Sequence, residues 1–138
     1  MITGLAHAAV TVKDMAESLR FYTEALGFRH AFDFRHPVTD EPWIVYLNIS
    51  HGQFIELFYG GTEDCPWHDS LTGFNHLCLE TDDIHAAVQK IRDAGYTIDS
   101  EPVQGLDHNW QAWTKDPNGN GIRIELMQIM PDSPQSKF

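Results

Sequence analysis

Two stretches of equal length decide the fold of this chain: HAAVTVKDMAESL at residues 7–19 and HLCLETDDIHAAV at residues 76–88. Each begins with a histidine, continues through apolar or small residues typical of a strand, and reaches an aspartate suited to start an amphipathic helix. His7 and His76 are 69 residues apart, and so are the aspartates Asp14 and Asp83. An internal duplication is the simplest explanation of these matched separations.

Working outward, each half repeats the same order of elements, so we predict an α+β fold of two β-α-β-β-β modules. We expect one domain over residues 1–138, with module one at about 3–60, a linker at 61–73, module two at about 74–130 and a tail at 131–138 that is extended or frayed. The residues after Asp14 form the first helix, in which Glu17 completes a capping box and Gly27 ends the helix. The predicted strands are 1–12, 28–34, 43–49 and 53–59 in the first half, and 74–80, 96–100, 110–115 and 122–128 in the second.

The composition limits the classes of function. A length of 138 residues with 42% hydrophobic residues suits one folded domain rather than a disordered chain. The net charge of −11 repels nucleic acid and anionic membranes, and no apolar run reaches the length of a membrane span. The two cysteines lack the spacing of a metal site, which favours a reducing compartment. We therefore expect a cytoplasmic protein with a small-molecule partner.

Four polar residues interrupt apolar strands at matched places: His7, Glu56, His76 and Glu125. The separation from His to Glu is 49 residues in each half. A carboxylate on the buried side of a strand costs several kcal/mol unless it is paired or bound to a metal. Alternatively, each residue points to water or is a hydrogen-bonded core residue, which is the better interpretation of any one of them alone. The duplication favours a shared site.

Two imidazoles and two carboxylates form a donor set for one divalent ion. If the two sheets face each other, pseudo-twofold symmetry brings His7 beside His76 and Glu56 beside Glu125 in a cupped sheet around the metal. The donors suit Ni, Co, Zn, Mn or Fe rather than Cu(I) or a cluster. We expect one such ion as the cofactor.

From residue 5 to about 130 the chain resembles the vicinal oxygen chelate superfamily (glyoxalase/bleomycin resistance/dioxygenase), most closely the glyoxalase I-like bacterial proteins. The resemblance rests on the repeat, on the four predicted ligands in the order His or Gln, Glu, His and Glu, and on two motifs. These motifs are S-x-x-F-Y…L-G-F, beginning at Ser18, and D-P-N-G…I-E-L, which contains Glu125. The resemblance implies a substrate bound through two vicinal oxygens, and a homodimer.

The predicted activity is that of a metal-dependent isomerase or lyase of the glyoxalase I type (lactoylglutathione lyase), which moves a proton next to a polarised carbonyl. Glu56 and Glu125 are the candidate catalytic bases, and the resemblance favours Glu125. The candidate substrate-binding residues are Phe58 and Trp113, as walls of the pocket, and Gln111 and Lys115, which share the strand face of Trp113.

Two departures from the glyoxalase I pattern concern glutathione. Thr11 stands where the pattern has an arginine, and Gly60 stands where it has an asparagine. The resemblance assigns both missing residues to glutathione binding, so glutathione dependence is doubtful. The turn before Glu125 is also two residues longer than usual, an even number that preserves the phase of the strand.

Two alternatives remain open. An Fe(II) ring-cleaving dioxygenase of the same fold would use two His and one carboxylate, and the fourth ligand, Glu56, argues against it. A non-catalytic small-molecule or drug-binding relative would lack the ligand set. The sequence also leaves open whether the modules pair within one chain or across a dimer.

Overall fold

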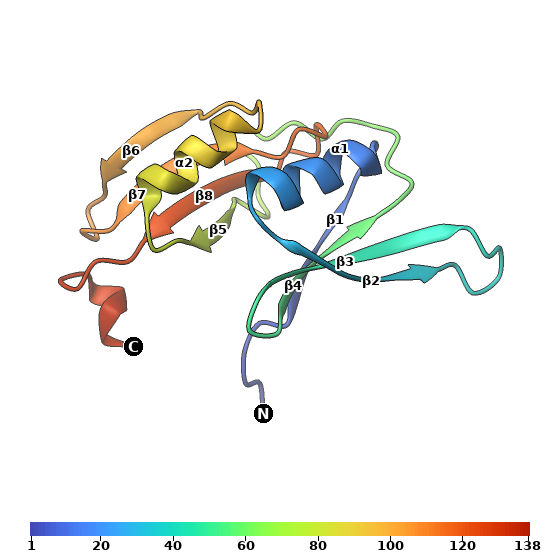
Figure 1. The fold of residues 1–138 in the computed structure, drawn as a ribbon, viewed down its shortest axis with the longest axis horizontal. Helices are drawn as coiled ribbons and strands as arrows, with labels where there is room; N and C mark the ends of the chain where they lie inside the picture. The colour runs from blue at the N-terminus through green and yellow to red at the C-terminus, as the bar shows by residue number, and fades with distance from the viewer.

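The computed structural model, which describes residues 1–138, contains two four-stranded mixed sheets with few helices (Figure 1). The first sheet has the strand order β1-β4-β3-β2, and the second has the corresponding order β5-β8-β7-β6. In each sheet one pair, β1 with β4 or β5 with β8, is parallel, and the other pairs are antiparallel. The predicted α+β class with two β-α-β-β-β modules is confirmed.

The first half contains β1 (His7–Thr11), α1 (Met15–Arg20), the π-helix η1 (Phe21–Ala25), β2 (Arg29–Arg35), β3 (Pro42–Ser50) and β4 (Gln53–Phe58). The second contains β5 (Leu77–Glu80), α2 (Ile84–Asp93), β6 (Ser100–Gln104), β7 (Trp110–Lys115), β8 (Arg123–Gln128) and the 3₁₀ helix η2 (Pro134–Lys137). None of these helices has both the length and the apolar composition that a bilayer crossing requires.

The start of α1 shows how the two modules are joined. The Asp14 carboxylate accepts a hydrogen bond from the Glu17 N–H at 3.0 Å, as predicted for an N-cap. The second half of the capping box is wrong, because the Asp14 N–H donates to Asn118 Oδ1 at 2.8 Å. Glu17 instead pairs with Arg20 at 2.7 Å. The acceptor for the Asp14 N–H therefore comes from the turn before β8, whereas the sequence predicted that Glu17 of the same helix would supply it.

The hydrophobic core is shared between the modules. Ile84, Val88 and Ile91 on α2 are buried, as the helical spacing predicts, and they join one core cluster with residues of α1, η1 and both sheets. The helices lie beside each other on one side of the sheets (Figure 1), and the contact between the halves runs through η1 and α2. The opposite faces of the sheets carry the polar residues of interest.

The strand predicted at residues 96–100 is wrong, since β6 begins at Ser100. Tyr96 packs edge-on against Phe21, with 4.9 Å between ring centroids, and the Thr97 carbonyl accepts a hydrogen bond from Thr114 Oγ1 at 2.8 Å. The first contact ties the start of this segment to the helix layer, and the second ties Thr97 to β7 through a side chain, without the backbone ladder of a strand. The first strand of each module is also shorter than predicted, because β1 begins at His7 and β5 at Leu77.

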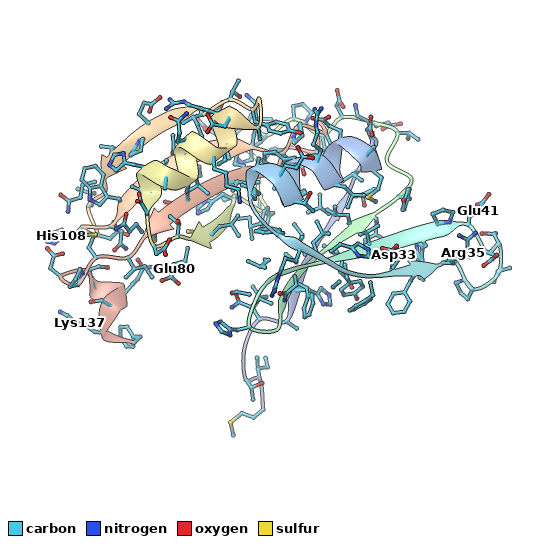
Figure 2. All side chains as sticks on the ribbon, viewed as in Figure 1. Asp33, Arg35, Glu41, Glu80, His108 and Lys137 are labelled. Atoms are coloured by element: carbon cyan, nitrogen blue, oxygen red, sulfur yellow. The ribbon has the colours of Figure 1, made fainter.

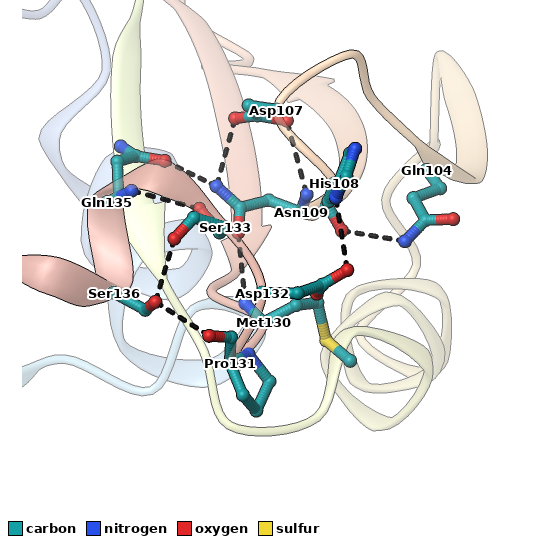
Figure 3. Close-up of polar contacts among 10 residues, drawn as sticks. All are labelled: Gln104, Asp107, His108, Asn109, Met130, Pro131, Asp132, Ser133, Gln135 and Ser136. Atoms are coloured by element: carbon teal, nitrogen blue, oxygen red, sulfur yellow. Dashed lines mark hydrogen bonds and ion pairs between the residues drawn. The ribbon is translucent and has the colours of Figure 1, made fainter.

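The C-terminal tail is folded rather than frayed, which corrects the prediction for residues 131–138. η2 is capped by Ser133, which is fully buried and accepts a hydrogen bond from the Gln135 N–H at 3.1 Å. Asn109 is also fully buried: its Oδ1 accepts from the Met130 N–H at 2.9 Å, and its amide nitrogen donates to Asp107 and Gln135 (Figure 3). This network ties the tail to the loop before β7.

The β2–β3 hairpin projects from the body of the molecule. Figure 2 labels Asp33, Arg35 and Glu41 along it, and every residue of β2 is exposed. Phe32 stacks on Tyr46 with 4.5 Å between ring centroids, although Phe32 remains 43% exposed. An aromatic surface of this kind, left uncovered within the chain, is typical of a contact surface.

Candidate metal centre

His7 and Glu56 form the first polar pair, on the neighbouring parallel strands β1 and β4. The register places Ala9 opposite Glu56, so the alternation of the strand puts His7 on the same face as the carboxylate. His7 Nε2 lies 3.4 Å from Glu56 Oε2. The Glu56 side chain is 8% exposed and that of His7 is 45% exposed. The carboxylate is thus buried beneath an accessible imidazole.

His76 and Glu125 repeat this arrangement in module two. His76 directly precedes β5, and Glu125 lies on β8 opposite Cys78. The distance from His76 Nε2 to Glu125 Oε2 is 3.0 Å, and the side chains are 33% and 7% exposed. The His76 ring packs edge-on against Trp113, with 4.9 Å between centroids. The duplication therefore reproduces the local geometry as well as the spacing.

The two pairs remain separate within one chain. The sheets lie side by side (Figure 1), and a groove of about 680 Å³ runs where β1 meets β5. No group of three or more His, Cys, Asp or Glu side chains in the structure is arranged so that it could hold a metal ion. The sequence analysis required the two sheets to face each other for the four residues to meet. Within one chain the sheets do not face each other in this way, so the four residues do not meet. Each pair offers two donors of the type that Zn, Mn, Fe, Co and Ni accept, so the residues fit a divalent ion as two half-sites.

The candidate substrate-binding residues divide between the half-sites. The register puts Trp113 opposite Glu125 and Gln111 opposite Met127, so both residues share the face of Glu125. Lys115 lies on that face too, and its Nζ is 3.3 Å from Asp99 Oδ1. Phe58 lies on the face of Glu56, where it packs edge-on against Trp43 at 6.0 Å. The structure therefore brings three of the four together and leaves Phe58 with the other half-site.

Cys78, on the same face as Glu125, is exposed. Partial desolvation, and then the negative charge of Glu125 and a hydrogen bond to it, raise the pKa of Cys78 to about 12. The thiol is therefore protonated at neutral pH.

The remaining histidines are peripheral to both pairs. His30 and His108 are exposed and pair with nearby carboxylates: His30 with Asp33 at 2.7 Å and His108 with Asp132 at 3.0 Å. The ion pair places His108 with the tail.

A feature that the pattern of ligands did not indicate lies beside the second half-site. The Cζ atom of Arg123 is 4.0 Å from the centroid of the Trp67 ring and 4.5 Å from that of Trp113. Arg123 and Trp67 line a cavity of about 440 Å³ at the end of the second sheet. The one available sequence signal was the position of Arg123, two residues before Glu125 on the same strand face. Nothing in the linker distinguished Trp67 beforehand.

The positions that depart from the glyoxalase I pattern lie at the edge of the first half-site. Thr11 is exposed at the end of β1, opposite Phe58. Gly60 has a φ of +100°, a conformation that residues with a side chain rarely adopt. An asparagine would be strained in the backbone found at position 60.

Comparison with known proteins gives consistent matches over nearly the whole chain. Residues 4–124 match the family described as Glyoxalase/Bleomycin resistance protein/Dioxygenase superfamily. A probable lactoylglutathione lyase of Vibrio parahaemolyticus is 33% identical over 130 residues, covering 90% of this chain and 89% of the relative. An ethylmalonyl-CoA/methylmalonyl-CoA epimerase of Cereibacter sphaeroides is 26% identical, covering 94% of this chain and all of the relative. A glyoxalase family protein from Enterococcus faecalis shares the fold, with a TM-score of 0.74 at 20% identity over 90% of this chain and 96% of the other.

Proposed function

Because this chain belongs to the Glyoxalase/Bleomycin resistance protein/Dioxygenase superfamily, we propose that it is a metal-dependent isomerase or lyase of the glyoxalase I type. Its substrate is a small molecule with two vicinal oxygens. The observation that carries the proposal is the pair of buried carboxylates, each within 3.4 Å of a histidine at the equivalent place in the two modules. A buried carboxylate is costly for stability unless it is paired or bound to a metal, and the accessible imidazole beside each one can act as its partner or as a second metal donor.

The proposed ligands are His7, Glu56, His76 and Glu125, which together hold one divalent ion, one of Ni, Co, Zn, Mn or Fe. Two of them alone hold a metal weakly. Because each half-site lies on the face that the chain leaves uncovered, we propose that a second copy supplies the missing pair, in a homodimer. The exposed aromatic residues of the hairpin, such as Phe32, support this, since a second copy can bury them.

The proposed reaction is a proton transfer carried by the two glutamates. A bound divalent ion would act as a Lewis acid towards the substrate carbonyl. Glu125 takes the proton from the neighbouring carbon, and a carboxylate returns it to either carbon, which gives isomerisation or epimerisation without net oxidation. Glu56 is the second candidate. The names of the relatives, a lyase and an epimerase, are consistent with this chemistry.

We further propose that the hemithioacetal of glutathione is a poor substrate. The chain lacks the arginine and asparagine of the pattern at Thr11 and Gly60, and the backbone at Gly60 disfavours an asparagine. The net charge of −11 also disfavours a tripeptide with two carboxylates at long range. A steady-state assay with the methylglyoxal–glutathione hemithioacetal tests this. Turnover near the diffusional ceiling, on the order of 10⁷ M⁻¹s⁻¹ or more in kcat/KM, would contradict it.

Mixing two inactive variants tests the whole arrangement. His7→Ala and His76→Ala chains are each unable to form an intact site as homodimers. If each site takes module one from one chain and module two from its partner, a mixed dimer has one intact site. Random exchange of subunits then restores about a quarter of the wild-type metal content and activity, because half of the dimers are mixed and one of their two sites is intact.

Four outcomes would count against the proposal. Recovery of no metal on mixing, with both variants folded and dimeric, would contradict the shared site. Full metal retention in the His76→Ala variant would contradict the ligand assignment. Purified wild-type protein that binds no divalent ion would favour the non-catalytic binding relative. Cleavage of a catechol with oxygen after loading with Fe(II) would favour the dioxygenase.

A further inference from the structure

Arg123 is a cation without an acidic partner. Five of the nine lysines and arginines pair with a carboxylate, as Lys115 does with Asp99. Arg123 forms no ion pair, and no side-chain hydrogen bond involves its guanidinium. Its contacts are the Trp67 and Trp113 rings, at 4.0 and 4.5 Å from Cζ to ring centroid. Stacking on indole satisfies the π-face of a guanidinium and leaves the N–H donors at its edge free.

The linker fixes one side of this arrangement. The Cys65 N–H donates to the Gly119 carbonyl at 2.8 Å, and a Cβ added at Gly119 or Gly121 would collide with Asp64 or with the backbone of Cys65. The linker and the turn before β8 therefore pack so closely that a side chain at either glycine would collide with the linker. This packing sets Trp67 over Arg123, so the guanidinium is held in place before any ligand arrives.

The carboxylates around the cavity are already engaged. Asp64 pairs with Lys13, Asp99 pairs with Lys115, and Asp116 accepts a hydrogen bond from the Tyr22 hydroxyl at 2.6 Å. These acidic groups line the same cavity of about 440 Å³ as Arg123, which is within the range of small-molecule sites. Arg123 is thus the one charged group at the cavity that has no ion pair or side-chain hydrogen bond within the chain.

We propose that Arg123, held by Trp67 and Trp113, binds a carboxylate group of the substrate and so selects substrates that carry one. This inference rests on the proposed function and names its substrate class. The planar fork of a guanidinium matches a carboxylate through two parallel hydrogen bonds. Three neighbouring aspartates penalise a phosphate dianion more than a carboxylate monoanion, which decides between the two kinds of anion.

The position relative to the proposed metal ligands supports a role in substrate selection. Arg123 and Glu125 lie on the same face of β8, and Trp113 contacts both the Arg123 guanidinium and the His76 ring. A single indole therefore separates the anion site from the second half-site. A small substrate can place its vicinal oxygens at the ligands and its carboxylate at Arg123.

The test uses the full-length protein stripped of metal, so that it is independent of the metal site. Propionate, propionamide and inorganic phosphate are titrated at constant ionic strength, while the NMR resonance of the Arg123 Nε–H and tryptophan fluorescence are followed. We expect propionate to shift the resonance, propionamide to leave it unchanged, and phosphate to bind more weakly than propionate. Arg123→Gln should weaken propionate binding about ten- to a hundredfold, because a charge-assisted hydrogen bond is lost.

Two variants control for charge and geometry. Arg92→Gln removes the same charge from an exposed residue paired with Glu101, and should leave propionate binding unchanged. Arg123→Lys keeps the charge but not the fork, and should weaken binding several-fold. Equal propionate binding by wild type and a folded Arg123→Gln variant, or no shift of the Arg123 resonance in wild type, would show that the residue only anchors the linker and would overturn the inference. Tighter binding of phosphate would overturn the choice of carboxylate.

Metal content measured separately on the same variants keeps the two proposals distinct. Arg123→Gln is expected to bind metal as the wild type does. Wild-type protein that binds propionate at Arg123 but no metal would contradict the proposed function alone, whereas normal metal binding without propionate binding would contradict this inference alone.

Discussion

The open faces of the two sheets carry the same His–Glu pair in different surroundings. In module one the pair lies beside exposed aromatic residues, among them Phe32 and Phe34, which nothing in the chain covers. In module two the pair adjoins Trp113 and an arginine that the linker holds in place. The repeat thus reproduces the residues proposed as metal ligands, whereas the segments outside the repeat make the two faces different.

The loops of the two modules also differ in how far the rest of the chain covers them. The loop between β2 and β3 in module one is exposed at the tip of the projecting hairpin (Figure 2). The loop between β6 and β7 in module two is tied to the C-terminal tail through the buried Asn109 (Figure 3). The loop of module one therefore stays exposed, whereas the loop of module two is fixed by the tail.

The largest expected effect tests whether the two pairs are equivalent in chemistry. Glu125→Gln should lower kcat by about 10³-fold, because it removes the proposed base. Glu56→Gln should reduce metal affinity to a similar extent as Glu125→Gln if both are ligands, but should lower kcat less at saturating metal. Metal analysis and steady-state kinetics with the proposed substrates measure both. Equal losses of kcat would show that the two carboxylates share the proton transfer.

The next effect concerns the loops. Asn109→Ala should lower the free energy of unfolding by about 2–4 kcal/mol, because the Met130 N–H and the Asp107 carboxylate lose a buried partner. Urea denaturation measures this change. Thr39→Ala in the exposed loop of module one is the matched control, with an expected change within about 0.5 kcal/mol. Similar losses in the two variants would contradict the contrast between the loops.

A smaller effect tests the hydrogen bond from the Tyr22 hydroxyl to Asp116, which joins the two modules. Burial, and then the charge of Asp116, raise the pKa of Tyr22 well above its usual value. The unfolded chain loses the phenolic proton near pH 10 while the folded chain keeps it, so stability falls as the pH rises beyond about 10, by up to about 1.4 kcal/mol per unit. Tyr22→Phe should remove this part of the alkaline slope and cost about 1–2 kcal/mol at neutral pH.

Denaturation curves between pH 8 and about 11 follow the effect of Tyr22. Tyr59→Phe, at a tyrosine that is 40% exposed, should leave the slope unchanged. If Tyr22→Phe retained the full alkaline slope, the bond between Tyr22 and Asp116 would not be the source of the coupling.

The smallest effect concerns glutathione at the first half-site. Thr11→Arg restores one cationic residue of the glyoxalase I pattern at an exposed position, where an ion pair contributes about 0.2–1 kcal/mol. We expect kcat/KM for the glutathione hemithioacetal to rise no more than about fivefold. A rise of a hundredfold would show that position 11 alone limits glutathione use.

Local features of the fold could be predicted because their causes lie within a few residues. The caps at Asp14 and Asp83, the buried stripe of α2 and the end of the first helix at Gly27, with φ of +80°, follow from hydrogen bonding and sterics of neighbouring residues. The matched separation of 69 residues also identified the four polar residues His7, Glu56, His76 and Glu125, because strands of equal length and phase bring equivalent residues to the same face.

Contacts between distant segments could not be predicted. Asn118 takes the N–H that the capping box assigned to Glu17, and Tyr96 packs on Phe21 instead of entering the sheet. Nor does any sequence pattern place Trp67 of the linker over Arg123. Each of these contacts joins elements whose separation along the chain carries no information about their distance in space.

The sequence by itself therefore determined the repeat, the order of the elements and the four polar residues that recur at matched places, whereas the pairing of a histidine with a glutamate in each half came from the structure. Only the tertiary structure decided that the two pairs stay apart within one chain and that an arginine is held beside one of them. The reason is that strand phase and helix caps depend on neighbours along the backbone. The relative placement of two sheets depends instead on many weak contacts in the shared helical core, which no single motif encodes.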